Sequence, residues 1–191
     1  RGMSSAASDV YKRQLLASVN SDILGRNIPQ NLKSPANKWF ALSKRTRIIV
    51  TSKDRVKEGQ ITKIEDLADE QWKGRVCSRP GSHVYNRALM ASLILSLGEK
   101  AAEDWAKKFV GNLARRPQGN DRAQVKAIFE GQCDISIINN YYFGKLKYSD
   151  DPSQREWAKS VRLIFPNQGA EDRGAHVNLS LIHISEPTRR T

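Results

Sequence analysis

The 191-residue sequence is poor in the patterns that mark several common functions. Its only cysteines, Cys77 and Cys133, form no Cys-x-x-Cys motif, and its three histidines have no His-x-x-x-His spacing, so a zinc site has no support. No apolar run approaches the roughly 20 residues that a membrane-spanning helix needs. A nucleophile elbow, a phosphate-binding glycine-rich loop and a pair of catalytic carboxylates are also missing, which argues against an enzyme.

Acidic residues are fewer than basic ones, and the formal net charge is +12. The lysines and arginines are spread along the chain without a run of four. They are not interleaved with aromatic residues as in grooves that stack nucleobases, so nucleic-acid binding is not expected. Hydrophobic residues make up 39% of the chain and include four tryptophans, which is enough for a packed core.

The two ends of the chain differ from its middle. Residues 1–14 and 180–191 resemble translated sequencing-adapter sequence, a contaminant of assembled reading frames, and are left out of the fold prediction. We expect both ends to make few contacts and to have no place in a sheet. The remainder is then expected to be a fragment cut at both ends, so the absence of a signal peptide carries no information.

Strand-like and helical patterns alternate in the middle of the chain. Residues 75–78 and 135–138 read as buried strands, and the segments 85–97 and 99–113 between them have apolar residues at helical spacing. Short connections between such units are typical of a parallel sheet with right-handed crossovers. The sequence therefore predicts an α/β lobe in which helices flank a parallel sheet.

Two further strand-like runs, 39–43 and 47–51, precede this region and are separated by a basic turn. Arg45 and Arg47 have two interpretations, as residues that face a ligand cleft or as solvated surface residues, and the second is preferred because arginine is rarely buried. Another strand is predicted at 161–165.

Polar side chains follow the strand at 135–138 in the run Asn139-Asn140-Tyr141-Tyr142. Ligands of open α/β sheets lie beyond the carboxyl ends of the strands, and Gly144 makes a turn easy at this point. Tyr85 begins the helix after the other strand, so all three phenols are expected at one rim. Periodicity alone leaves open that one tyrosine of the pair is core and the other surface. The loop 79–82 offers free backbone N–H groups before a helix, a natural anion site.

These motifs, taken in order, resemble the ferric-iron-binding periplasmic proteins, which are the solute receptors of iron ABC transporters. The similarity lies in the paired-tyrosine run, in 66–75, in 79–86 and in 114–121, and it covers about residues 15–180. It implies a type II periplasmic-binding-protein fold. The resemblance divides the chain into a non-native end at 1–14, a remnant of lobe 1 with a hinge strand at 15–51, lobe 2 at 52–161, a return hinge strand at 162–179 and a non-native end at 180–191.

The resemblance implies that Tyr85, Tyr141 and Tyr142 are ligands of ferric iron. This ion is small and hard, and it prefers anionic oxygen such as that of a phenolate. Free tyrosine has a pKa of about 10, so binding must displace protons. Nearby cations favour the phenolate, and the candidates are Arg79, Arg115, Lys145 and Lys147, although an ordinary surface position is the expectation for any single one of them.

Ser82, Asn120 and Asn139 stand at positions similar to the anion pocket of that family, and whether an anion binds is left open. Either Asn120 or Asp121 is expected to cap the following helix. His83 is expected to begin a helix rather than to bind metal.

By resemblance, the protein is a monomeric periplasmic receptor that closes on ferric iron and delivers it to an inner-membrane ABC permease, without inserting into the membrane itself. The alternative is a receptor of the same fold for another ligand, such as a small organic anion. A polyamine is disfavoured, because the loops carry few carboxylates. Cys77 and Cys133 are expected in neighbouring strands, where a disulfide and two inert thiols remain equal alternatives.

Overall fold

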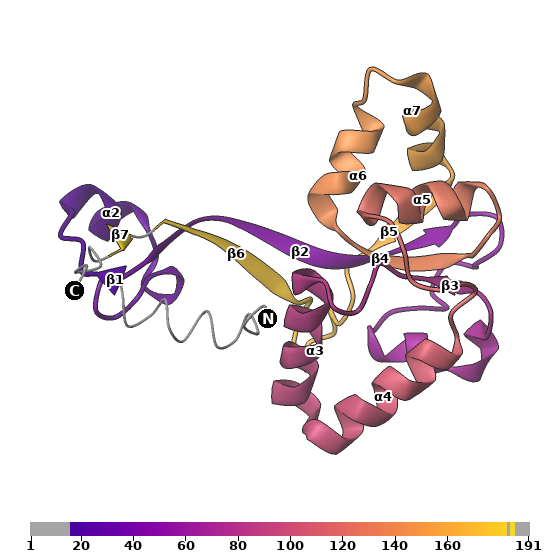
Figure 1. The fold of residues 1–191 in the computed structure, drawn as a ribbon, viewed down its shortest axis with the longest axis horizontal. Coiled ribbons are helices and arrows are strands. Elements are labelled where there is room, and N and C mark those ends of the chain that lie inside the picture. Colours follow the sequence, from indigo (N-terminus) through magenta and orange to yellow (C-terminus); the bar gives the residue numbers. More distant parts are fainter. Residues whose placement is uncertain (1–15, 183, 186–191) are drawn as a thin grey trace, which may run out of the picture. The chain divides into compact units, whose positions relative to one another are not determined.

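The fold is known from a computed structural model that describes residues 16–182 and 184–185 (Figure 1). The chain divides into two compact units, Arg45–Asn178 and a smaller one made of Arg1–Lys44 and Leu179–Thr191. No helix among the described residues is long and apolar enough to cross a membrane.

A mixed sheet forms the centre of the larger unit. Four of its strands are β2 (Phe40–Ser52), β3 (Val76–Cys77), β4 (Ile135–Asn139) and β5 (Val161–Ile164), in the order β3-β4-β2-β5, and the fifth, β6 (Val177–Ile182), also pairs with β2. β3 and β4 are parallel, as predicted, and β2 runs antiparallel to both β4 and β5. The α/β prediction is confirmed, but the sheet is not wholly parallel, because no crossover helix joins β2 to its neighbours and fixes its direction.

β2 corrects the prediction of two short strands around a basic turn. It is one strand of 13 residues that continues through Lys44 and Arg45. The sequence between the two apolar runs contains neither glycine nor proline, so nothing in it favours a turn over an extended chain. From Arg47 onward every residue of the strand is buried.

Helices cover both faces of this sheet. They are α3 (Val84–Leu97), α4 (Glu99–Gly111), α5 (Asp121–Phe129), α6 (Asn140–Lys147) and α7 (Pro152–Lys159). α3 and α4 lie on one face and α5, α6 and α7 on the other (Figure 1). Neighbouring strand residues point to opposite faces, so Ile49 packs with the first group and Ile48 with the second.

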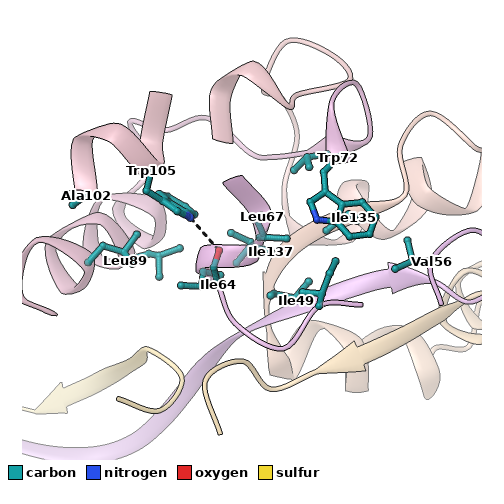
Figure 2. Packing of buried hydrophobic residues seen from close by; sticks show 13 residues of the cluster. Ile49, Val56, Ile64, Leu67, Trp72, Leu89, Ala102, Trp105, Ile135 and Ile137 are labelled. Carbon is teal, nitrogen blue, oxygen red and sulfur yellow. Dashed lines mark hydrogen bonds between the residues drawn. The ribbon is translucent and has the colours of Figure 1, made fainter. Parts of the chain in front are cut away.

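The core under α3 and α4 is closed by two short 3-10 helices, Glu65–Ala68 and Glu70–Trp72. Trp72 is fully buried, and the indole Nε1 of Trp105 donates a hydrogen bond to the carbonyl oxygen of Ile64 at 3.1 Å (Figure 2). This bond fixes α4 to the segment that leads into the sheet.

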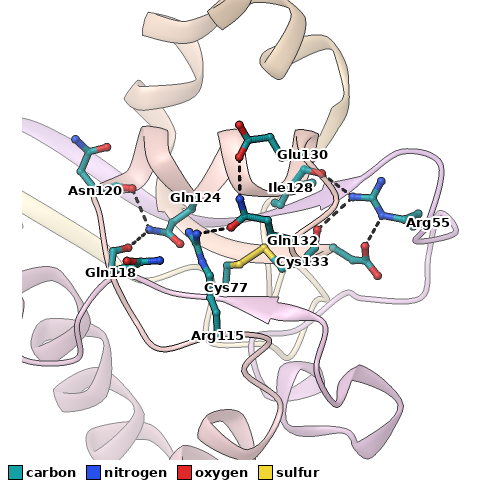
Figure 3. The surroundings of a disulfide bond; sticks show 11 residues. Arg55, Cys77, Arg115, Gln118, Asn120, Gln124, Ile128, Glu130, Gln132 and Cys133 are labelled. Atoms are coloured by element: carbon teal, nitrogen blue, oxygen red, sulfur yellow. Dashed lines mark hydrogen bonds and ion pairs between the residues drawn. A yellow bond between two sulfur atoms is a disulfide. The ribbon is translucent and has the colours of Figure 1, made fainter.

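Cys77 and Cys133 form a disulfide between β3 and the residue stretch just before β4 (Figure 3). Their Cα atoms are 5.8 Å apart, within the range that a disulfide spans. Of the two alternatives left open by the sequence, the structure contains the disulfide. Near it, Nη1 of Arg115 donates to the side-chain oxygen of Gln132 at 2.5 Å.

The smaller unit contains β1 (Leu16–Ala17), which pairs antiparallel with β7 (Ile184–Ser185), and the short helix α2 (Asp22–Asn27). β6 (Val177–Ile182) runs through the boundary between the units. The expectation that 180–191 has no place in a sheet is therefore wrong, since its apolar and β-branched residues suit a strand whatever their origin. Residues 1–14 and 186–191, for which the same was expected, lie outside the described residues.

Candidate functional site

The paired tyrosines lie on the first turn of a helix. β4 ends at Asn139 and α6 begins at the next residue, so Tyr141 and Tyr142 belong to α6, which also contains Gly144. The predicted turn is thus a helix. The planes of the two phenol rings are tilted by 30°, and the ring centroids are 4.3 Å apart.

Tyr85 is the second residue of α3, directly after the loop that follows β3. His83 is the N-cap of this helix, and its Nδ1 accepts a hydrogen bond from the backbone N–H of Tyr85 at 3.2 Å. The predicted role of His83 at a helix start is confirmed. Burial and the charge of Arg79 lower the pKa of His83, so the neutral, accepting imidazole is favoured.

The structure brings the predicted phenols together. The hydroxyl oxygens of Tyr85 and Tyr141 are 3.5 Å apart, and all three tyrosines are half-buried. Burial raises the pKa of Tyr141, and hydrogen bonds with Tyr142 and Tyr85 raise it further. Tyr141 therefore holds its proton more firmly than a free phenol when no cation is present.

Cations surround the rings of these tyrosines. The guanidinium carbons of Arg45, Arg47 and Arg79 lie 5.9, 5.9 and 5.2 Å from the centroid of the Tyr85 ring. Nζ of Lys145 lies 5.6 Å from the Tyr141 ring. Positive charge therefore lies beside two of the three phenol rings.

Arg47 is buried, and the interpretation of Arg47 as a surface residue is wrong. Its side chain is 1% exposed and bonds to Asp121 at 3.3 Å, to the side-chain oxygen of Asn86 at 2.9 Å and to the carbonyl oxygen of Ile137 at 3.3 Å. Burial lowers the pKa of Arg47 to about 10, although Asp121 acts in the opposite direction. These partners are far away in the sequence, so local pattern gave no sign of them.

Asp121 connects the residues of this buried hydrogen-bond network. One carboxylate oxygen accepts from Nη1 of Arg79 at 2.7 Å, and the other accepts from Arg47 and from the backbone N–H of Asn139 at 2.7 Å. Asp121 itself is fully buried. Two guanidinium groups thus share one carboxylate, which leaves an excess of positive charge under the rim.

The residues predicted for an anion pocket have different surroundings. Ser82 is exposed in the loop before α3. Asn120 is the N-cap of α5, and its Oδ1 accepts from the backbone N–H of Ala123 at 3.1 Å. The side-chain amide of Asn139 is fully buried, and neither its oxygen nor its nitrogen has a partner among the described residues. A buried amide without partners normally binds something, so Asn139 is the strongest of the three.

Within residues 16–182 and 184–185, no group of three or more His, Cys, Asp or Glu side chains could hold a metal ion. A metal at this rim would therefore depend on the phenol oxygens. Phenolates suit a hard, highly charged cation and not a soft one.

Several known proteins are similar to this chain in sequence and in fold. Residues 5–171 match the family described as bacterial extracellular solute-binding protein. The chain is 48% identical over 162 residues to "Iron uptake protein A1" of Synechocystis, covering 85% of this chain and 44% of that protein. The solved structure of apo FutA2 from Synechocystis PCC6803 has 42% identity and a TM-score of 0.85, covering 91% of this chain and 55% of that one.

A Trichodesmium protein solved in complex with iron and citrate ligands has 41% identity and a TM-score of 0.85. That match covers 96% of this chain and 58% of the other. The chain thus spans about half the length of the proteins it matches.

Proposed function

The chain belongs to the bacterial extracellular solute-binding protein family and carries part of its type II periplasmic-binding-protein fold, and from this premise we propose that it binds ferric iron through the phenolates of Tyr85, Tyr141 and Tyr142. The family consists of binding proteins, so the activity is binding and not catalysis. Several relatives are named for iron uptake or for binding Fe(3+), which supports this choice of solute.

The observation that carries the proposal is the approach of the Tyr85 and Tyr141 hydroxyls to 3.5 Å, with the ring of Tyr142 4.3 Å from that of Tyr141. A plain core gains nothing from three phenols at one point, because each buried hydroxyl needs its own partner. A hard trivalent cation would displace their protons and bind the oxygens together. The surrounding arginines and Lys145 would help to stabilise the phenolates once the cation has displaced their protons.

An anion is proposed as a further ligand at the same rim. The unpaired amide of Asn139 and the excess charge of Arg47 and Arg79 over Asp121 support it. Ser82 and the free side-chain nitrogen of Asn120 would complete the pocket from the two loops beside it.

The activity of the whole protein goes beyond the half that this chain represents. We propose that the complete protein is a monomeric periplasmic receptor that closes on the metal by hinge motion and delivers it to an inner-membrane ABC permease. A second candidate is a receptor of the same fold for a small organic anion, which the same excess of buried positive charge favours.

A visible-light titration tests the iron proposal. Ferric citrate added to the protein should give a coloured phenolate-to-iron charge-transfer band that saturates. The double variant Tyr141→Phe/Tyr142→Phe should lose most of this band. Tyr148→Phe is the matched control, because Tyr148 is 78% exposed just beyond α6 and should leave the band unchanged.

Two outcomes would contradict the iron proposal: a double variant that titrates like the parent, or no band at all. Calorimetry with citrate alone distinguishes the organic-anion receptor from the iron receptor. A receptor for organic anions binds citrate without iron, and it keeps that binding in the variant Tyr141→Phe/Tyr142→Phe.

A further inference from the structure

A cavity of about 240 Å³ lies in the larger unit between α3, α4 and the sheet. None of the three phenols lines it. Figure 2 shows part of its surroundings, where Leu89 of α3, Trp105 of α4 and Ile137 of β4 face a common space. Most of the wall is apolar and comes from Leu89, Met90, Trp105, Phe109, Leu113 and Ile137.

Aromatic surface dominates one side of this cavity. The rings of Trp105 and Phe109 are stacked, with centroids 5.0 Å apart. The only polar atom of the indole is engaged by the carbonyl oxygen of Ile64, so Trp105 offers the cavity ring surface alone. Met90 is half-buried, and its flexible thioether can adapt to the outline of a guest.

The polar residues of the wall are bonded to one another. The Ser78 hydroxyl donates to the carbonyl oxygen of Arg79 at 2.9 Å, and the Asn86 amide donates to that carbonyl at 3.0 Å. Nη1 of Arg79 is held by Asp121 at 2.7 Å. The Nε of Arg79 has no partner among the described residues but is itself buried, so a guest does not reach it without rearrangement.

We propose that this cavity is a binding site for a small uncharged apolar molecule that carries an aromatic ring. Stacking with the aromatic wall favours a ring. A charged guest would lose its hydration without gaining a partner, which is costly. A dry apolar cavity of about 150 Å³ is enough for benzene, so this one has room for a substituted single ring. The proposal does not rest on iron binding, and its test needs no metal.

Methionine NMR tests the proposal directly, because the chain has only two methionines. Met90 lines the cavity, and its signal is assigned as the one that Met90→Leu removes. With methyl-labelled methionine, toluene should shift the Met90 signal saturably, with a dissociation constant on the order of 1 mM. Benzoate, which has the same ring and a charge, should produce no such shift.

Two leucine substitutions on one helix locate the guest. Ala106 of α4 lines the cavity, and Ala106→Leu should fill it and abolish the toluene shift. Ala101 of α4 is exposed and does not line the cavity, so Ala101→Leu should keep the shift.

The proposal is overturned if toluene leaves Met90 unmoved, if benzoate shifts it as strongly, or if Ala106→Leu retains the full shift. If Ala106→Leu fails to fold, the toluene and benzoate titrations of the parent protein still test the proposal, because each has an outcome that contradicts an apolar site.

Discussion

The hydroxyl oxygens of Tyr85 and Tyr141 lie 3.5 Å apart although 56 residues separate these tyrosines in the sequence. Each stands in the first turn of a helix that follows a strand, Tyr85 after β3 and Tyr141 after β4. Because β3 and β4 are parallel neighbours, both helices begin at the same edge of the sheet. The fold thus places the two phenols together without any local sequence signal linking them.

Iron binding should release protons, and Tyr141 should supply one of them. Its raised pKa means that the phenol is neutral near pH 7, so a bound cation must displace the proton. Lowering the pH restores the protonated, metal-free form, and affinity should fall by about tenfold per pH unit for each proton displaced. Potentiometric titration should count one proton fewer per iron for Tyr141→Phe than for Tyr148→Phe. An equal count in both variants would argue that Tyr141 is not a ligand.

Replacing Asp121 should destabilise the larger unit strongly. Asp121→Asn leaves the buried guanidinium groups of Arg47 and Arg79 without their carboxylate, a change that typically costs about 3–5 kcal/mol. Urea unfolding measures this loss. The control is Asp150→Asn, since Asp150 is exposed and substitutions at such sites stay within about 0.5 kcal/mol. Similar unfolding midpoints for the two variants would show that the network is not a source of stability.

Removing the disulfide should also lower stability. The bond closes a loop between residues 56 positions apart, and the chain-entropy relation gives about 4 kcal/mol for such a loop. Cys77→Ala/Cys133→Ala should unfold at a lower urea concentration than the parent in oxidising buffer. A dithiol reductant should lower the midpoint of the parent and leave the variant unchanged. If the reductant has no effect on the parent, the bond is absent in solution.

Acid should remove the contribution of Asp134. Burial acts to raise the pKa of Asp134, but hydrogen bonds from Arg55 and from Arg75, the latter at 2.6 Å, outweigh it and lower the pKa below the ordinary 3.8. The folded state is therefore favoured above pH 3.8, and this advantage is lost as the pH falls through the lowered pKa.

Asp134→Asn should accordingly lower the melting temperature by about 2–4 °C at pH 7. The difference from the parent should vanish once the pH is below the lowered pKa of Asp134. Asp54 is exposed and directly precedes Arg55 in the sequence, so it offers a control. Asp54→Asn should have the melting temperature of the parent at either pH. A difference for Asp134→Asn that persists unchanged in acid would contradict the argument.

The sequence predicted the parts of the fold that follow from local pattern. The periodic leucines between Tyr85 and Gly98 predicted α3, which ends where Gly98 takes a φ of 85°. The burial of Arg47 was not predictable in this way, because it depends on Asp121, 74 residues further on. The division of β2 into two strands was wrong, since its basic middle contains neither glycine nor proline to force a turn.

For the candidate site, the predicted order of strands and helices together with the family resemblance placed Tyr85, Tyr141 and Tyr142 at one rim, which periodicity alone had left open. Their role as metal ligands stays a prediction. The pattern did not reveal the buried carboxylate and arginines beneath them, because charge compensation inside a protein is set by tertiary contacts.

The position of the disulfide also bears on how quickly the rim can form. Cys77 and Cys133 each stand eight residues before a rim tyrosine, Tyr85 and Tyr141 respectively. In the oxidised but unfolded chain, the disulfide already tethers the two segments that contain these tyrosines. Each segment is therefore present at a high effective concentration near the other, and no long loop has to close first. Contacts between distant residues normally slow folding, and here one covalent bond, if formed first, would remove much of that kinetic barrier.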